Sequence, residues 1–222
     1  MCPRSVESAS AVAGPGDLDA VREMWSGPDV LGTGGAFVLL TYLALPGLVA
    51  VRPPGGRPRA AFDGMAERTF LLRLLGLTTE PEWGGGVGNR EVRRLAATLG
   101  REHRAFAGMR QDHMELIAAL VALAPLLVRR AWGRPVGGGE LRSYWRYMTC
   151  ATALMETRLE GWPAAEQRCR AFCAEHAGRS AAARRLLAQF AGRHPGYVAA
   201  AVPLLFPEPR AVVRAALGDA DD

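Results

Sequence analysis

The sequence of 222 residues contains no lysine, one isoleucine and one asparagine, so all 27 basic residues are arginine. This skew is typical of a GC-rich bacterial coding sequence. It excludes every chemistry that needs a lysine, including Schiff bases and phosphate-binding loops of the P-loop type. Four cysteines are too few for a disulfide scaffold. With 49% hydrophobic and 22% charged residues, the composition is that of a globular protein.

The net charge of +5 does not by itself indicate a nucleic-acid partner. The densest basic cluster, Arg101, Arg104 and Arg110, is interleaved with Glu102 and Asp112. The sequence shows no basic stripe, zinc-finger spacing or aromatic-rich RNA motif. We therefore expect no nucleic-acid partner, and helix-turn-helix readout is the one form of it left open.

The amino-terminal residues 1–16 are small and polar, and no charged region leads into an apolar run as in a secretory signal. We therefore expect reduced thiols and a cytoplasmic protein. Residues 34–51 carry no charge and approach the ~20 residues that span a bilayer, but Pro46 and Gly47 interrupt them. They predict a buried core helix and no transmembrane span, with peripheral membrane contact as the alternative.

Helical periodicity dominates the chain and strand-like alternation is almost absent. We predict an all-α, single-domain bundle of about eight to ten helices around a buried apolar core helix. A tail at 1–16 precedes the domain at 17–218, and an acidic tail at 219–222 follows it. The helices are expected near 17–25, 34–51, 58–76, 89–107, 112–132, 140–160, 164–176, 180–192 and 209–217.

Five segments stand out when taken in order: FVLLTYLALPGLVAV at 37–51, AERTFLLRLLG at 66–76, VRRLAATLGREHRAF at 92–106, DHMELIAALVALAPLLVRRAWGRPVGGGELRSYWRYM at 112–148 and VPLLFPEPRAVVRAALG at 202–218. Together they resemble the family of haem-dependent oxygenases that includes latex-clearing protein and the MpaB enzymes. The resemblance implies an all-α fold, haem b held by a histidine on a core helix, and oxidation of apolar substrates, including carbon–carbon double bonds.

The segment at 92–106 matches the region of the family that carries the iron ligand, so the resemblance makes His103 the candidate proximal ligand of the haem. The residues agree with an inward-facing position, because Val92, Leu95, Leu99, His103 and Phe106 form one helical stripe. A neutral imidazole there can coordinate iron through one nitrogen while the other donates to an acceptor. The alternative is a histidine that is only part of the core.

The resemblance places Arg68 and Thr69 over the distal face of the haem. Arg68 would hold a propionate or bound oxygen, and the hydroxyl of Thr69 would donate to the oxygen. The sequence departs from the rubber-cleaving pattern, which has a distal lysine and an earlier arginine, because it has no lysine and carries Met65 near that earlier position. The alternative is an arginine that reaches solvent and a threonine bonded to its own helix.

Glu166, Cys169, Cys173 and His176 form a competing constellation on one predicted helix face. These residue types bind zinc, but one helix rarely supplies a complete tetrahedral site, so buried cysteines with polar neighbours are the favoured interpretation. His113 opens a helix and is expected to cap it or face solvent.

His194 precedes Pro195 in a turn that ends a helix, with a second family histidine left open there. The stripe of Leu141, Tyr144, Met148, Ala151 and Met155 is expected in the core.

We therefore predict a haem b-dependent oxygenase that uses O₂ as cosubstrate and acts on an apolar polyketide, terpenoid or other unsaturated small molecule, in bacterial specialised metabolism. Arg68 and Thr69 are the predicted catalytic residues, and His103 and Arg68 hold the cofactor. Two alternatives stay open. One is the same scaffold without haem, catalysing a cyclisation or rearrangement. The other is a non-catalytic helical protein that binds a ligand or regulates a partner. The oligomeric state is open as well.

Overall fold

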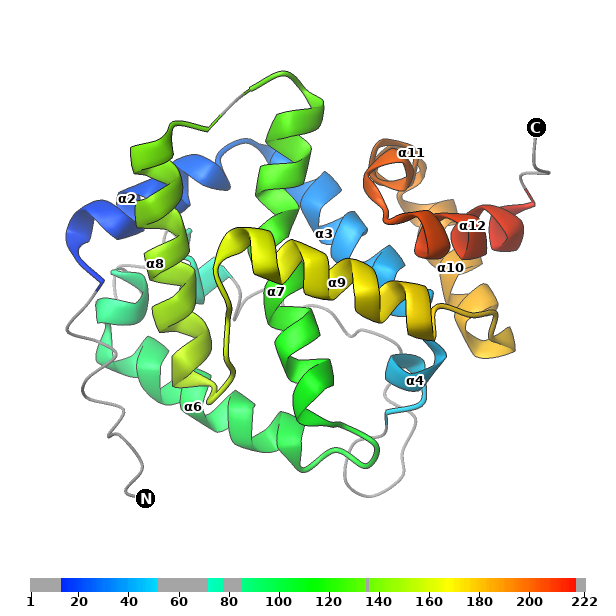
Figure 1. Ribbon diagram of the computed structural model, residues 1–222, viewed down its shortest axis with the longest axis horizontal. Coiled ribbons are helices and arrows are strands. Elements are labelled where there is room, and N and C mark those ends of the chain that lie inside the picture. The colour runs from blue at the N-terminus through cyan, green and yellow to red at the C-terminus, as the bar shows by residue number, and fades with distance from the viewer. Residues whose placement is uncertain (1–12, 52–71, 78–84, 135, 219–222) are drawn as a thin grey trace.

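The computed structural model describes residues 13–51, 72–77, 85–134 and 136–218 (Figure 1). Within these ranges the chain is all α-helical and contains no strand, which confirms the predicted fold class. The helices are α2 (Pro15–Met24), α3 (Pro28–Leu43), α4 (Pro46–Val49), α6 (Arg90–Arg104), α7 (Gln111–Ala131), α8 (Gly138–Leu154), α9 (Trp162–His176), α10 (Ala181–Arg193), α11 (Pro195–Ala201) and α12 (Pro207–Leu217), with 3-10 helices η2 (Gly86–Gly88) and η3 (Val202–Leu204).

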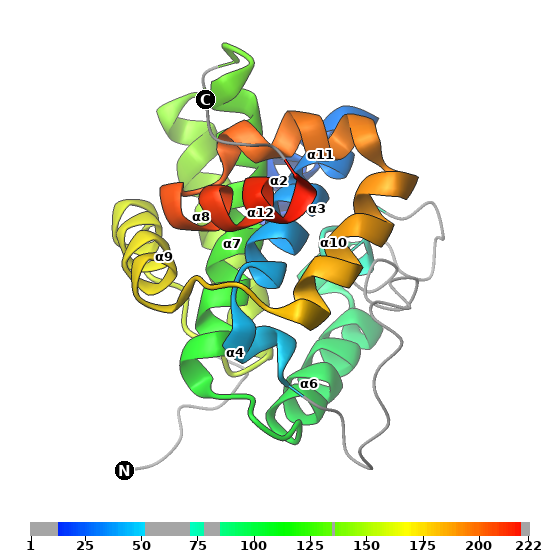
Figure 2. The same ribbon diagram turned by 90° about the vertical axis from the view of Figure 1, so that its right-hand side faces the viewer.

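Helices α3 and α7 pack against each other in the centre of the molecule (Figures 1 and 2). Gly34 lies at this contact: a Cβ atom there would meet the Ala124 Cβ of α7 at an ordinary 3.5 Å and the Trp25 ring at a tighter 3.2 Å. Phe37 and Leu40, on α3, are completely buried. The predicted buried core helix is therefore α3.

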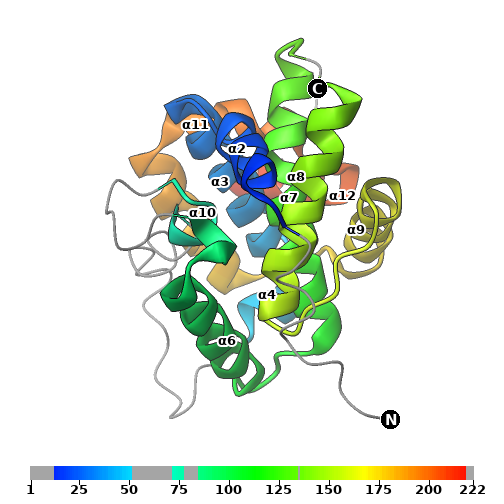
Figure 3. The ribbon, with the colours of Figure 1, turned by 90° about the vertical axis from the view of Figure 1, so that its left-hand side faces the viewer.

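The remaining helices cover this pair from different sides. Helix α2 packs along α8, α9 crosses α7, and α11 packs on α3 (Figures 1 and 3). Helix α6 lies below, beside the end of α8 (Figure 3). Tyr144, Met148 and Ala151 of α8 face the interior and are 2% exposed or less, as the stripe predicts. Most of the buried apolar side chains of the described residues form one continuous cluster.

The apolar stretch at 34–51 is not one helix. Helix α3 starts six residues earlier, at Pro28, whose fixed φ suits the first turn. It ends at Leu43, and the short helix α4 starts at Pro46, so the proline interrupts the stretch as expected. In the described part of the chain, no helix combines the length and the apolar character needed to cross a membrane.

Helix α8 ends at Leu154, six residues before the predicted end. Glu156 has φ 54°, a left-handed conformation that ends the helix. Arg104 of α6 holds this turn: its guanidinium donates to the Met155 carbonyl oxygen at 2.9 Å and pairs with the Glu156 carboxylate at 2.8 Å. The end of α8 is thus set by a contact with a distant helix, which periodicity does not report.

The turn at His194 ends α10 as expected, since His194 is its C-cap. A further helix, α11, which was not expected, begins directly after it at Pro195, because proline fits a first helical turn. The predicted helix at 58–76 lies mostly outside the described residues, and 72–74 are helical.

The hydroxyl group of Tyr147, on α8, joins two separate segments in the interior. It accepts a hydrogen bond from the Val87 N–H at 2.9 Å and donates one to the Leu74 carbonyl oxygen. Burial raises the pKa of Tyr147 to about 12, so the hydroxyl stays protonated and able to donate. Gly86 has φ 54°, and a Cβ there would overlap the hydroxyl, so the backbone can approach it only at a glycine.

We expect Tyr147→Phe to lower the free energy of unfolding by about 1–3 kcal/mol, because it leaves a buried N–H and a buried carbonyl without their partner. Urea unfolding followed by circular dichroism measures this. An unchanged midpoint and slope would show that the hydroxyl contributes nothing to stability.

We also expect Gly100→Ala to be destabilising by about 1–3 kcal/mol, because the new Cβ would lie 2.8 Å from backbone atoms of Met155, which cannot swing aside. Gly35→Ala is the matched control, since its Cβ would have no neighbour within 4 Å. An exposed helical Gly→Ala change is stabilising by up to about 1 kcal/mol. Equal unfolding midpoints for the two variants would contradict the close contact between α6 and the end of α8.

Candidate functional site

His103 lies in the last turn of α6, where the chain turns toward α7 (Figure 3). Its imidazole is half-buried and meets the edge of the Phe106 ring, with ring centroids 5.4 Å apart and planes at 85°. Of the stripe that contains it, Val92 is fully buried, while Leu95 and Leu99 are half-buried. The most buried face of α6 instead carries Val92, Ala96 and Gly100. His103 therefore lies beside the buried face of the helix, at its edge.

His113 is buried, contrary to the expectation that it caps its helix or faces solvent. It lies in the first turn of α7 and is 4% exposed. Its ring meets the edge of the Phe172 ring at a centroid distance of 6.0 Å, and Gly47 of α4 closes the opposite approach. The correction has a packing reason: α9 and α4 both cover the start of α7, and neither neighbour is near it in sequence.

The Nδ1 atom of His113 is buried and has no hydrogen-bond partner in the described structure. Burial lowers the pKa of His113, and the nearby Arg110 lowers it further, while Asp112 opposes the shift. Asp112 is itself held by Arg110, whose guanidinium donates to it at 2.7 and 3.0 Å, and this contact lowers the pKa of Asp112. A backbone hydrogen bond with Gly108 also raises the pKa, but burial has the largest effect and the net shift is downward, which favours a neutral imidazole in the folded protein.

The face of α9 that carries Glu166, Cys169, Cys173 and His176 does not form one site. Both thiols are fully buried in the core, where burial raises the pKa of Cys173 to about 12 and that of Cys169 also upward. Glu166 instead pairs with Arg170 at 2.7 Å, and His176 stacks on Phe172 at 4.3 Å. In the part of the chain that the structure describes, no three His, Cys, Asp or Glu side chains are grouped to hold a metal ion.

The predicted distal residues Arg68 and Thr69 fall within 52–71, which lie outside the described residues. Whether they lie near His103 is therefore a prediction that the described residues do not test.

The described residues form two adjoining surface hollows of about 250 and about 480 Å³, and both are bordered by Asp29 and Trp132. Trp132 directly follows the last residue of α7, whereas His113 lies in its first turn. At a rise of 1.5 Å per residue, these two positions are separated by about 28 Å along the helix. The hollows and His113 thus lie at opposite ends of α7.

The hollows are lined by residues that the sequence did not single out as functional, among them Arg134, Arg193 and Tyr197. Trp132 and Tyr197 belong to sequence segments 65 residues apart, so no local motif could join them. The available signal was weaker: a tryptophan at the polar end of an apolar helix, next to a Gly-Arg turn. Such a ring is expected either to pack on the next helix or to line a surface site.

Comparison with known proteins gives no support to any family assignment. No protein-family model, no curated protein and no solved structure matches the chain.

The buried His113 predicts a pH-dependent stability. Because its folded-state pKa is lowered, the unfolded chain binds more protons below the ordinary histidine pKa of about 6.5, so the free energy of unfolding falls as the pH drops from 7 to 5. The loss is limited to about 1.4 kcal/mol per pH unit for one group. His113→Phe keeps a ring without the proton site and should lose less stability over this interval. Urea unfolding at pH 7 and pH 5 tests this, and an equal loss in both proteins would contradict it.

Proposed function

We propose that the chain is a haem b-dependent oxygenase that acts on an apolar, unsaturated small molecule, with His103 as the iron ligand. Arg68 and Thr69 are the proposed distal residues, and O₂ is the cosubstrate. The sequence resemblance over most of residues 30–218 is the origin of this proposal, and the helical architecture agrees with it. The structural observation that carries it is a pair of at least half-buried imidazoles, His103 and His113, flanking the junction of α6 and α7.

The fit of a haem can be tested against the described side chains. A haem iron needs a neutral imidazole nitrogen, and His113 offers one in its unpartnered Nδ1. His103 is less buried and lies against Phe106. An imidazole is therefore present at both positions. Neither of the two hollows beside Trp132 borders His103 or His113.

A bound haem would supply the iron that binds and activates O₂. The contribution of the protein is then to hold the ligating ring in one orientation. For His103 this is done by the edge contact with Phe106, and for His113 by Phe172 and by the close approach of Gly47. Arg110 and Asp112 form an ion pair with each other beside His113, so each of these two charges already has a partner.

The test is haem binding by the purified protein, followed by an absorbance titration in the Soret region. We expect one haem per chain, and we expect His103→Phe to abolish or strongly weaken binding because it removes the nitrogen but keeps an aromatic ring. His113→Phe is the matched control and should keep both the stoichiometry and the Soret position. Circular dichroism of both variants shows that the fold is intact.

Two outcomes would contradict the proposal in different ways. Loss of the Soret band in His113→Phe but not in His103→Phe would move the ligand to the start of α7. If the wild-type protein takes up no haem, the oxygenase function is rejected. The two alternatives then stay open: a haem-free cyclase or isomerase, and a non-catalytic ligand-binding protein. The second alternative is favoured by a specific observation, the pair of lined hollows at the other end of α7.

A further inference from the structure

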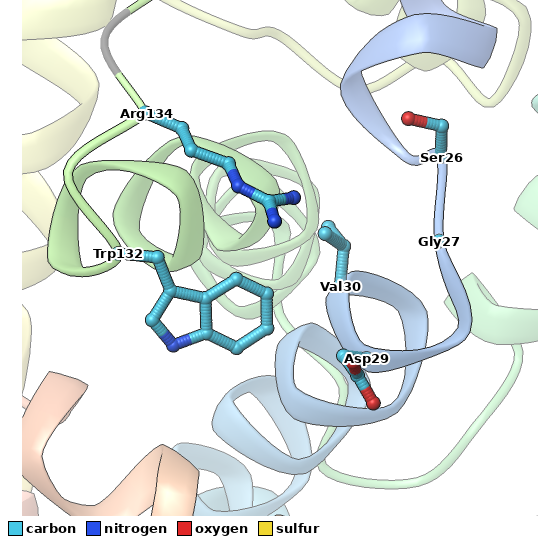
Figure 4. Close-up of a pocket in the computed structure, with 6 residues that line it drawn as sticks. All are labelled: Ser26, Gly27, Asp29, Val30, Trp132 and Arg134. Carbon is cyan, nitrogen blue, oxygen red and sulfur yellow. The ribbon is translucent and has the colours of Figure 1, made fainter.

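The two adjoining hollows form one groove, which we call the Trp132–Tyr197 groove. Three parts of the fold meet there: the start of α3, the turn after α7 and the junction of α10 with α11. Figure 4 shows the smaller hollow, in which the side chains of Trp132 and Arg134 extend from the turn after α7 toward Asp29 and Val30 of α3. The larger hollow holds about 480 Å³, within the range of about 300–1,000 Å³ that small-molecule sites occupy.

The exposed tryptophan and tyrosine side chains of the described structure both border this groove. Trp132 is 39% exposed and Tyr197 is 37% exposed, and they are the large hydrophobic side chains that the described surface leaves open. Both border the larger hollow, although they come from different helices. Exposed apolar side chains that are scattered need no explanation, but two aromatic rings that face one hollow indicate a binding surface.

The position of the Tyr197 ring depends on a glycine. A Cβ atom at Gly32 of α3 would lie 2.3 Å from Cε1 of that ring, so the ring rests directly on the helix backbone. The imidazole of His194 lies beside it, with centroids 6.3 Å apart and planes inclined at 32°. The backbone at Gly32 and the imidazole of His194 therefore fix the position of the Tyr197 ring at the edge of the groove.

Three charged side chains border the groove without an ionic partner. Asp29, Arg134 and Arg193 make no side-chain hydrogen bond or ion pair within the described structure, and the Arg134 guanidinium lies 6.0 Å from the centre of the Trp132 ring. By contrast, Arg168 and Arg170 of α9 are paired with carboxylates. One unpaired arginine thus borders each hollow.

We propose that the Trp132–Tyr197 groove binds a planar aromatic monocarboxylate. The two exposed rings offer faces for stacking, and an arginine at each hollow offers a fork of N–H donors that matches a carboxylate. Asp29 borders both hollows and disfavours a ligand with several negative charges, such as a polyphosphate, while it accepts a hydrogen bond from a donor on the ring. The site is about 28 Å from His113 and is independent of haem.

Isothermal titration calorimetry with naphthalene-2-carboxylate tests the ligand class. Naphthalene-2-methanol removes the charge and cyclohexanecarboxylate removes the aromatic ring, so the carboxylate of naphthalene should bind at least tenfold more tightly than either. Because the ligand carries one carboxylate, Arg134→Gln or Arg193→Gln, whichever removes the arginine that pairs with it, should weaken binding at least tenfold, which corresponds to about 1.4 kcal/mol. Both variants should leave binding of the neutral alcohol unaffected. Arg185→Gln, an exposed position on the same α10 as Arg193, is the matched control.

A glycine pair tests the geometry. Gly32→Ala should displace the Tyr197 ring and weaken binding of naphthalene-2-carboxylate, whereas Gly35→Ala on the same helix has no neighbour within 4 Å and should not. Circular dichroism of each variant verifies the fold, since all these positions are at the surface or beside a movable side chain.

The proposal is overturned if the arginine variants bind naphthalene-2-carboxylate as the wild type does, or if the wild type does not bind it. It is also overturned if analytical ultracentrifugation shows a dimer that Trp132→Ala dissociates, because a second copy would then occupy the groove. The haem experiment is separate: the arginine variants should give the wild-type Soret result whichever way that result falls, so the two proposals can fail independently.

Discussion

The close packing of α3 on α7 is the constraint on which the rest of the structure depends. Both helices are apolar on nearly all sides, so each must be covered by neighbours over most of its circumference. Gly34 of α3 lies at this contact, beside Trp25 and Ala124. Once this pair is in contact, α2 with α8, α9, and the group α10–α12 fill the exposed sides (Figures 1 and 2).

A few hydrogen bonds from side chains to backbone atoms join the outer segments to one another. The Tyr147 hydroxyl bonds to Val87 and Leu74, and the Arg104 guanidinium bonds to the carbonyl oxygen of Met155. Each contact joins segments more than 50 residues apart and satisfies a carbonyl or N–H that burial would otherwise leave unpaired. Such contacts fix where a helix ends, which hydrophobic burial alone does not, because burial depends on area and has no preferred direction.

The sequence predicted what depends on local pattern and missed what depends on distant neighbours. Periodicity gave the helical class, the core position of Tyr144, Met148 and Ala151, and the interruption at Pro46. It placed the end of α8 six residues too late, because the contact with Arg104 comes from another helix. It also put His113 at the surface, since the first turn of α7 is polar in sequence and is buried by α4 and α9. The groove was not predicted at all, because its rings come from segments 65 residues apart.

The two ends of α7 differ in the chemistry they can support, and the difference follows from what covers them. The start of the helix is covered by α4 and α9, so its imidazole is neutral and buried among aromatic rings, an environment that suits a metal ligand or a plain core residue. At the other end of the helix, Trp132 is 39% exposed, so its indole remains in contact with water. An arginine exposed to solvent keeps its charge and can exchange water for a carboxylate at small desolvation cost, whereas the buried ring of His113 could not become charged at small cost. Recognition of an anion therefore belongs at the open end, and neutral imidazole chemistry at the closed one.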